Sequence, residues 1–256
     1  MLTAITREAG SSLVNCQLTY LDRQSIDIGK AIQQHKAYEA LLMRLGVHVV
    51  CLPAEPEMPD AVFVEDVAVV TNELAVMTRM GAESRRAESE SLARVLSEFF
   101  PVHFLSAPAT LDGGDVLRIG QTFYVGLSAR TNNEGLEQLR EALLPQGYDV
   151  AVVAVEACLH LKTGCTYLGR GVLLANPSWV DVSALPGLEV IPVPVDEQAA
   201  ANTLTVNGTT ILPGTFPHTK QLLQTRGFTI ETLDISEFQK AEAGLTCMSI
   251  IFEGRN

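Results

Sequence analysis

A pattern of about fifty residues recurs along most of this 256-residue chain. Each copy has two short apolar stretches around a turn, then a segment with helical periodicity, then a third apolar stretch. In the first clear copy we expect strands at 67–70 and 74–78, a helix at 84–100 and a strand at 102–105. A doubly wound α/β sheet fits this pattern less well, because it alternates single strands with helices.

Three further copies follow the first. The second has expected strands at 116–119, 122–125 and 150–155 with a helix at 133–144; the third has strands at 166–168, 172–175 and 188–193 around a shortened segment; the fourth has strands at 204–206, 210–212 and 228–233 with a helix at 218–225. The fourth hairpin turns on Asn207-Gly208, the strongest dipeptide signal for a hairpin.

Both ends of the chain are needed to complete a fifth copy. The apolar run 243–252 would pair with a strand at 2–6, followed by a helix that the stretch 25–27 can start and that runs to about Leu45, and by a strand at 47–52. Repeats of this size whose ends meet in one unit are typical of propellers. The sequence therefore predicts an α/β fold, a five-bladed α/β propeller of ββαβ-type units around a central site, in one catalytic domain spanning 1–256.

Charge and cysteine content narrow the classes of partner. The formal net charge is −12 and the 18 basic residues are scattered, which argues against nucleic acid as a partner and favours a cationic ligand.

We find no apolar run of about 18 residues that would span a membrane. The N-terminal residues lack an export signal, and the five cysteines contain no C-x-x-C pair. We therefore expect reduced thiols and a cytoplasmic protein.

One cysteine, Cys247, lies in the apolar run near the C-terminus. A buried cysteine usually acts as a small hydrophobic residue. It does nucleophilic chemistry as a thiolate, and for that it needs a base and a group that orients the base. The question is therefore whether the other units supply such groups.

Polar residues precede the hairpins of three successive units. Glu65 and Asp66 interrupt an apolar run, and paired buried carboxylates need a cation such as a guanidinium, although a solvated turn is the usual alternative. The segment from Asp112 to Asp115 holds two glycines, which predicts a tight turn with its backbone close to a neighbour, or else a plain acidic turn. His160 stands among apolar residues, where a hydrogen-bonded core histidine is the common alternative.

These segments occupy corresponding positions in successive units, as does the segment of Cys247. We expect them to meet on one face of the ring, where cysteine, histidine and carboxylate would form a nucleophilic set. Metal binding is the competing use of these residue types, but the tight ligand spacings of zinc sites are absent from the sequence.

Six segments together carry a resemblance to a known family. They are 59–66 (PDAVFVED), 79–86 (RMGAESRR), 110–115 (TLDGGD), 126–132 (GLSARTN), 159–162 (LHLK) and 245–247 (LTC). In order and spacing they resemble the dimethylarginine dimethylaminohydrolases, members of the guanidine-modifying (pentein) enzymes, which have a five-bladed α/β propeller. The likeness runs along nearly the whole chain.

The resemblance implies a covalent mechanism. Cys247 would attack the guanidinium carbon of an Nω-methylated arginine, and His160 would protonate the departing methylamine or dimethylamine. The thiouronium intermediate would then be hydrolysed to citrulline with His160 as base and Asp112 orienting its imidazole.

The resemblance also implies a set of substrate-binding residues. Glu65 and Asp66 would hold the guanidinium nitrogens, two arginines would bind the substrate carboxylate, and two main-chain carbonyls would bind its amino group. The predicted set is Leu18, Asp60, Glu65, Asp66, Arg85, Arg130 and Ala241. A surface salt bridge is the commoner role of a single arginine. The family implies no cofactor and no metal.

Some positions depart from the family pattern. Ala241-Glu242-Ala243 stands where the family commonly has an apolar residue, aspartate and glycine, and Met80 replaces a frequent proline. Asp112 stands where some members use glutamate. The polar segment 16–25 is our candidate for a lid over the site.

Two alternative functions remain open from the sequence. The chain could be another guanidine-modifying enzyme, such as an arginine deiminase or amidinotransferase, although about fifty residues per unit leave no room for the added segments of those enzymes. It could also be a non-catalytic propeller that binds an arginine derivative or a protein. The expected partner is a small guanidine substrate, with no nucleic acid or membrane, and a homodimer is compatible with the sequence.

Overall fold

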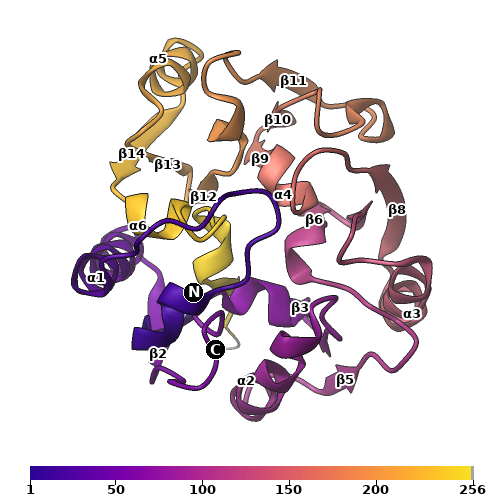
Figure 1. Cartoon of the computed structure of the whole chain (residues 1–256). Coiled ribbons are helices and arrows are strands. Elements are labelled where there is room, and N and C mark those ends of the chain that lie inside the picture. Colours follow the sequence, from indigo (N-terminus) through magenta and orange to yellow (C-terminus); the bar gives the residue numbers. More distant parts are fainter. Residues whose placement is uncertain (255–256) are drawn as a thin grey trace.

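Five three-stranded sheets form a ring in the computed structural model, which describes residues 1–254 (Figure 1). In chain order the sheets contain β3 (Ala68–Val70), β4 (Ala75–Met77) and β5 (Val102–Phe104); β6 (Val116–Ile119), β7 (Thr122–Leu127) and β8 (Asp149–Ala154); β9 (Cys165–Gly169), β10 (Val172–Ala175) and β11 (Glu189–Pro192); β12 (Leu204–Val206), β13 (Thr209–Pro213) and β14 (Thr229–Leu233); and β15 (Ile250–Glu253), β1 (Leu2–Arg7) and β2 (His48–Leu52). In each, an antiparallel hairpin is extended by a parallel third strand. The predicted five-bladed propeller is confirmed; the remainder of the predicted domain, 255–256, lies outside the described residues.

Helices connect the second and third strands of four sheets and lie at the outside of the ring (Figure 1). They are α1 (Ile28–Arg44), α2 (Ser89–Leu96), α3 (Asn133–Leu143) and α5 (Pro217–Thr225). The third unit has a short 3-10 turn, Val182–Ala184, in place of a helix, as its shortened sequence predicts. Short helices α4 (Leu161–Gly164) and α6 (Ser236–Gln239) lie nearer the centre.

The fifth sheet joins the two ends of the chain. Leu2 of β1 pairs with Glu253 of β15, and Thr3 pairs with His48 of β2 in parallel register. The predicted closure of the ring is therefore confirmed. At the fourth hairpin, Asn207 and Gly208 both have positive φ angles, 48° and 80°, as the tight turn requires.

One expected helix is confirmed and another is wrong. Helix α1 begins at Ile28, directly after the predicted start at 25–27, because the carboxylate of Asp27 caps it by accepting the N–H of Lys30 at 3.0 Å. The expected helix at 84–100 is a 3-10 turn, Glu83–Glu88, followed by the shorter α2. With three residues per turn, the 3-10 geometry places Arg85 and Glu88 on one face, and both are buried.

The expected strand at Cys247 is also wrong. Cys247 lies in a 3-10 turn, Thr246–Met248, and β15 begins at Ile250. The turn is held by Asn202, which accepts the N–H of Thr246 at 3.1 Å and donates to its hydroxyl at 3.0 Å. Apolar side chains of the sheets and outer helices fill the core, among them Tyr38, Leu42 and Leu139, which are fully buried. No helix in residues 1–254 is long and apolar enough to cross a membrane.

Candidate active site

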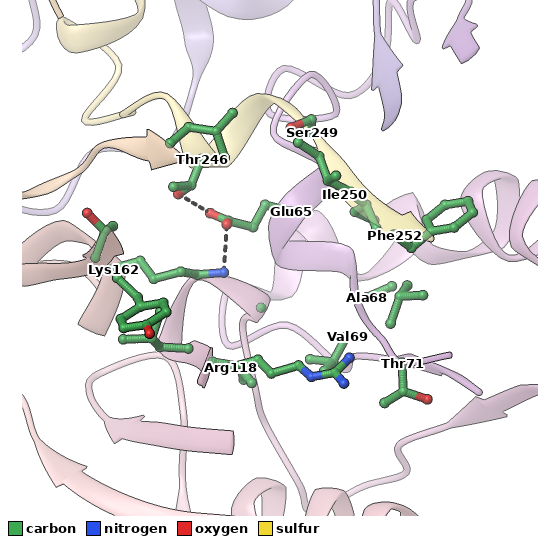
Figure 2. Close-up of a pocket in the computed structure, with 18 of the residues that line it drawn as sticks. Glu65, Ala68, Val69, Thr71, Arg118, Lys162, Thr246, Ser249, Ile250 and Phe252 are labelled. Carbon is green, nitrogen blue, oxygen red and sulfur yellow. Dashed lines mark hydrogen bonds and ion pairs between the residues drawn. The ribbon is translucent and has the colours of Figure 1, made fainter. Parts of the chain in front are cut away.

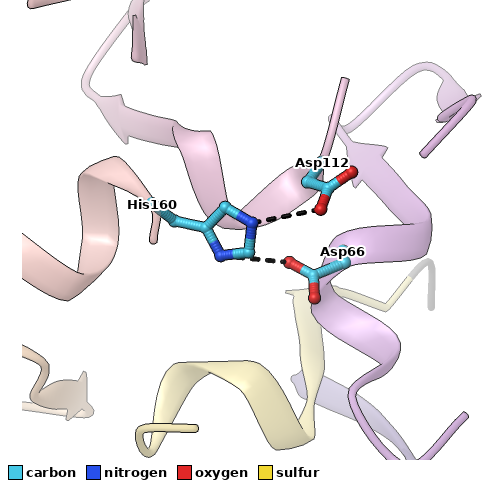
Figure 3. Close-up of side chains that lie close together, drawn as sticks. All are labelled: Asp66, Asp112 and His160. Carbon is cyan, nitrogen blue, oxygen red and sulfur yellow. Dashed lines mark hydrogen bonds and ion pairs between the residues drawn. The ribbon is translucent and has the colours of Figure 1, made fainter. Parts of the chain in front are cut away.

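His160 lies between two buried carboxylates. Its Nε2 is 3.1 Å from Oδ2 of Asp112, and its Nδ1 is 3.8 Å from Oδ1 of Asp66 (Figure 3). His160 immediately precedes α4, Asp112 precedes a 3-10 turn at Gly113–Asp115, and Asp66 lies in the 3-10 turn Val64–Val67. The structure thus brings together one residue from each of three successive units, as the repeat predicts.

Charge controls the protonation of His160. Burial alone would lower the pKa of the imidazole, but the charge of Asp66, the hydrogen bond to Asp112 and the charge of Asp115 together raise it to about 9. The pKa of Asp66 falls to about 2, because the cations His160 and Arg85 overcome the effect of its burial. His160 is therefore an imidazolium at neutral pH and can act as an acid.

Two glycines let these groups approach one another. A Cβ atom on Gly114 would lie 2.6 Å from Nδ1 of His160 and 2.8 Å from Oδ1 of Asp66, and one on Gly113 would lie 2.0 Å from the carbonyl oxygen of Glu65. The N–H of Gly114 donates to Asp66 at 3.0 Å. The close backbone approach predicted from the two glycines is confirmed.

Cys247 is half-buried, and its sulfur accepts the N–H of Gly244 at 3.4 Å. Burial and the negative charges of Glu65 and Asp66 raise the pKa of its thiol far above the ordinary value. Within residues 1–254 no hydrogen bond joins Cys247 to His160. The thiol is therefore neutral in the free protein, and a cation near the sulfur would favour the thiolate.

Glu65 faces a lysine that the sequence analysis did not select. Its Oε1 is 2.6 Å from Nζ of Lys162, and its Oε2 accepts the hydroxyl of Thr246 at 2.7 Å (Figure 2). The three side chains line a cavity of about 480 Å³ whose lining, within the described chain, does not include Cys247 or His160. Both oxygens of Glu65 thus have partners, so its predicted contact with a guanidinium stays a prediction.

Arg85 lies in a buried network of carboxylates. Its guanidinium donates to Asp66 at 2.6 Å, to both oxygens of Glu88 at 3.1 and 3.0 Å, and to the main-chain oxygens of Asp60 and Phe63. These bonds hold Asp66 in place beside His160. Binding of a substrate carboxylate by Arg85, as predicted from the resemblance, stays a prediction and would require some of these bonds to be exchanged.

The candidate lid, 16–25, contacts two predicted substrate-binding side chains. The N–H of Gln17 donates to both oxygens of Asp60, at 3.1 and 3.2 Å, and Arg130 donates to the hydroxyl of Thr19 at 3.0 Å. Burial raises the pKa of the Asp60 carboxyl, although the charge of Arg85 opposes the effect. Arg130 also lies 3.9 Å from Asp112. The segment thus lies against the site.

Glu242 attaches the same segment by its main chain. Its carboxylate accepts the consecutive N–H groups of Thr19, Tyr20 and Leu21, at 2.9, 2.5 and 2.5 Å. Its φ angle is +58°, in the left-handed region that few residues other than glycine and asparagine adopt. Glu242, at the departure from the family pattern, therefore holds the candidate lid by hydrogen bonds.

The two predicted main-chain ligands have free carbonyl groups. Neither the oxygen of Leu18 nor that of Ala241 accepts a hydrogen bond from residues 1–254. Ala241 is buried, and Leu18 is partly buried against the same apolar cluster. These oxygens are available to an ammonium group, which keeps the prediction of an amino-group site open.

A metal ion is the other use of this residue set. One ligand atom each from Asp66, Asp112 and His160 lies within 4.8 Å of the others, which a divalent ion could bridge. Arg85 already neutralises Asp66, and the raised pKa of His160 opposes the neutral form that a metal would require. The donor set therefore fits protonated histidine better than a metal ligand.

The matches to known proteins decide the family. A family model described as "N,N dimethylarginine dimethylhydrolase, eukaryotic" matches residues 14–238. The dimethylarginine dimethylaminohydrolase of Pseudomonas aeruginosa is 38% identical over 250 residues, covering 97% of this chain and 98% of the relative. The chain belongs to the dimethylarginine dimethylaminohydrolase family. The Streptomyces coelicolor enzyme of the same name is 37% identical, and the match covers 96% of this chain and 95% of that enzyme.

Solved structures of the dimethylarginine dimethylaminohydrolases have the same fold. A cysteine-to-serine mutant from Pseudomonas aeruginosa, complexed with citrulline, matches with a TM-score of 0.93 at 38% identity and 98% coverage of both chains. A histidine-to-glycine variant solved as an adduct with S-methyl-L-thiocitrulline matches with the same TM-score and identity, over 98% of this chain and 99% of that one. The two substitutions affect a cysteine and a histidine, the residue types of Cys247 and His160.

Sequence reasoning missed several residues around the site. Lys162 lies within a motif that carried the resemblance, and Asp115 ends the two-glycine turn, so both had a signal that was left without a role. Glu242 stands in the departure from the family pattern at 241–243, which did not indicate its contact with Thr19. Asn202 had no signal, because its partner Thr246 is far away in the sequence. These contacts form only in the folded ring, where the distant segments meet.

Proposed function

We propose that this chain hydrolyses Nω-methylated arginine to citrulline and dimethylamine or methylamine. Family membership supports the reaction type, because the relatives it matches over nearly their full length are named for this hydrolysis. The observation that carries the proposal is the position of His160 between the buried carboxylates Asp66 and Asp112, of which Asp66 also acts by its charge on the thiol of Cys247. Such a site favours a cationic substrate.

The substrate's positive charge would activate the nucleophile. In the free protein, burial and nearby carboxylates keep the Cys247 thiol protonated. A guanidinium held beside Asp66 places a positive charge near the sulfur, so the thiol proton is lost to solvent and the thiolate attacks the guanidinium carbon. The N–H of Gly244 donates to the sulfur and supports the charged form.

His160 would serve each of two half-reactions. As an imidazolium it donates a proton to the methylated nitrogen, the carbon–nitrogen bond breaks, and the amine leaves while the carbon–sulfur bond remains. The neutral imidazole then takes a proton from water, and the hydroxide adds to the carbon. The adduct loses its hydroxyl proton to solvent as the carbon–sulfur bond breaks, which gives citrulline and the thiolate. Asp112, bonded to Nε2, holds the ring in position through both steps.

The carboxylate and ammonium groups of the substrate would be bound next to the candidate lid, 16–25. Arg130 is the better placed of the two arginines for the substrate carboxylate, because one of its bonds is to the hydroxyl of Thr19 and can be exchanged. The free main-chain oxygens of Leu18 and Ala241, with Asp60 nearby, would bind the ammonium group. Segment 16–25 would open to admit the substrate and close over it.

The remaining expectations extend this proposal. The proposed partner is a small guanidine substrate, and we propose no binding to nucleic acid or membrane. The proposed location of the protein is the cytoplasm. A homodimer is compatible with this proposal.

An arginine deiminase-like activity is the nearest alternative, because it uses the same residue types. Steady-state citrulline formation from asymmetric dimethylarginine, monomethylarginine and arginine separates the two. Faster turnover of arginine than of both methylated substrates would overturn the proposed substrate.

A further inference from the structure

Asp115 is a fully buried carboxylate that the proposed mechanism does not use. Its Oδ2 accepts the hydroxyl groups of Ser128 at 2.6 Å and Thr131 at 2.7 Å, and its Oδ1 accepts the N–H of Leu161 at 2.9 Å. It forms no salt bridge with any residue from 1 to 254. A buried carboxylate that three hydrogen-bond donors hold without a salt bridge is costly, so its contacts merit a functional explanation.

Each of the three donors to Asp115 is joined to a different predicted site residue, either as its neighbour in the chain or by a hydrogen bond. Leu161 follows His160 directly, so the bond to its N–H fixes the main chain that carries the imidazole. Thr131 also accepts the N–H of Asp112 at 3.2 Å, and Ser128 also accepts the N–H of Arg130 at 3.0 Å. One carboxylate thus joins the segments that carry the acid, its orienting partner and the arginine at the lid.

Strand β7 packs closely against Asp115. A Cβ atom on Gly126 would lie 3.0 Å from Oδ1 of Asp115, so the neighbouring strand β7 lies directly against the carboxylate. Burial raises the pKa of Asp115 to about 6, while the charge of His160 and the hydroxyl groups of Ser128 and Thr131 oppose that rise. At neutral pH the ionised carboxylate adds a further negative charge beside the imidazolium.

We propose that Asp115 is a positioning residue, which sets the geometry of His160, Asp112 and Arg130 through the Leu161 N–H, Thr131 and Ser128. This inference rests on the proposed function, because it assigns these three residues to the reaction. It predicts two consequences of losing the carboxylate: a misplaced acid, and an imidazolium with one stabilising charge fewer. A residue that served stability alone would produce neither.

The test compares Asp115→Asn with Glu197→Gln. Glu197 is a matched control, because it is also buried and its carboxylate accepts two main-chain N–H groups, from His218 and Thr219, in the fourth unit. For Asp115→Asn we expect kcat for dimethylarginine to fall about 10- to 100-fold with a smaller change in KM, since the effect lies in the chemical step. Glu197→Gln should lose thermal stability to a similar degree with unchanged kcat.

Single substitutions test the hydrogen bonds of Asp115 with Thr131 and Ser128 separately. Thr131→Val removes the hydroxyl that joins Asp115 to Asp112 and should lower kcat, whereas Thr131→Ser keeps the hydroxyl and should retain most of the activity. Ser128→Ala removes the support of Arg130 and should mainly raise KM. If Thr131→Ser is as impaired as Thr131→Val, the hydroxyl bond is not the cause.

A titration of His160 by NMR makes the outcome independent of the substrate. With the signal assigned by His160→Gln, we expect the pKa of His160 to fall by at least about half a unit in Asp115→Asn and to stay unchanged in Glu197→Gln. Unchanged kcat and unchanged His160 pKa in folded Asp115→Asn would overturn the positioning role. Failure of the wild-type protein to release citrulline from any methylarginine, with the His160 shift intact, would instead overturn the proposed function.

Discussion

The imidazole of His160 lies 3.1 Å from the carboxylate of Asp112, which has no exposed surface. Asp112 keeps this position because its other oxygen accepts the N–H of Gly81 at 2.8 Å. The carboxylate can therefore hold the ring without rotating away. This arrangement holds the acid His160 in a fixed position.

Replacing Asp112 with asparagine should remove the charge that holds the ring while keeping the side chain's size. We expect kcat to fall about 100-fold or more, with KM changed less, because orientation and charge of the acid both suffer. Steady-state citrulline release measures the effect. Asp149→Asn, at an exposed position in β8, is the control and should retain wild-type rates.

The pH dependence follows from the His160 pKa of about 9. The first half-reaction needs the imidazolium, so its rate should be steady at neutral pH and fall as the pH rises through about 9. Rapid-quench measurement of amine release between pH 7 and 10.5 would show this limb. A rate that falls near pH 6.5 would mean that the carboxylates do not raise the pKa.

The same shift couples pH to stability. The folded-state pKa exceeds the ordinary value of 6.5, so the contribution is fully present below pH 6.5 and is lost as pH rises through about 9. The shift corresponds to roughly 3 kcal/mol at most. The free energy of unfolding should thus decline more between pH 6.5 and 9 in the wild type than in His160→Gln. Parallel curves would contradict this linkage.

Gly114→Ala should displace the acid by steric contact alone. The new Cβ would meet the ring of His160 and the carboxylate of Asp66, so we expect kcat to fall at least about 100-fold. Gly120→Ala is the matched control, since its φ of 61° makes the change strained but nothing lies within 4 Å of the new atom. The control should lose about 1 kcal/mol of stability and keep its rate.

Glu242→Gln should loosen segment 16–25. The amide cannot match a carboxylate that accepts three main-chain N–H groups, so the segment should open more often. We expect faster tryptic cleavage after Arg23 and a several-fold change in KM with kcat nearly constant. Glu83→Gln, whose side chain is exposed, is the control. Equal cleavage rates in the two variants would show that Glu242 does not hold the segment.

The sequence predicts the ring well because its signal is local. Hairpin turns such as Asn207-Gly208 and helical periodicity need no knowledge of distant segments, and a repeat of them determines the number of blades. Local patterns fail at Cys247, where an apolar run resembles a strand although Asn202 holds it as a 3-10 turn. An apolar run reports burial and leaves the backbone conformation undecided.

The site shows the same division. His160 and Asp112 could be selected because each precedes a hairpin at a corresponding position in its unit, and the structure brings them together. Partner choice could not be predicted in this way. The bonds from Glu65 to Lys162 and from Glu242 to Thr19 join residues far apart in sequence, and residue type does not reveal which cation or N–H a buried carboxylate will find.

We propose above all that Cys247 forms a covalent intermediate with a methylated guanidine. The most direct measurement is the intact mass of the protein during turnover of dimethylarginine under acid quench, comparing wild type with Cys247→Ser and with the Cys51→Ser control at an exposed thiol. We predict an adduct of the mass of the thiouronium species on Cys247 in the wild type and in Cys51→Ser, with citrulline as product, and neither in Cys247→Ser. Full citrulline release by Cys247→Ser would contradict the account.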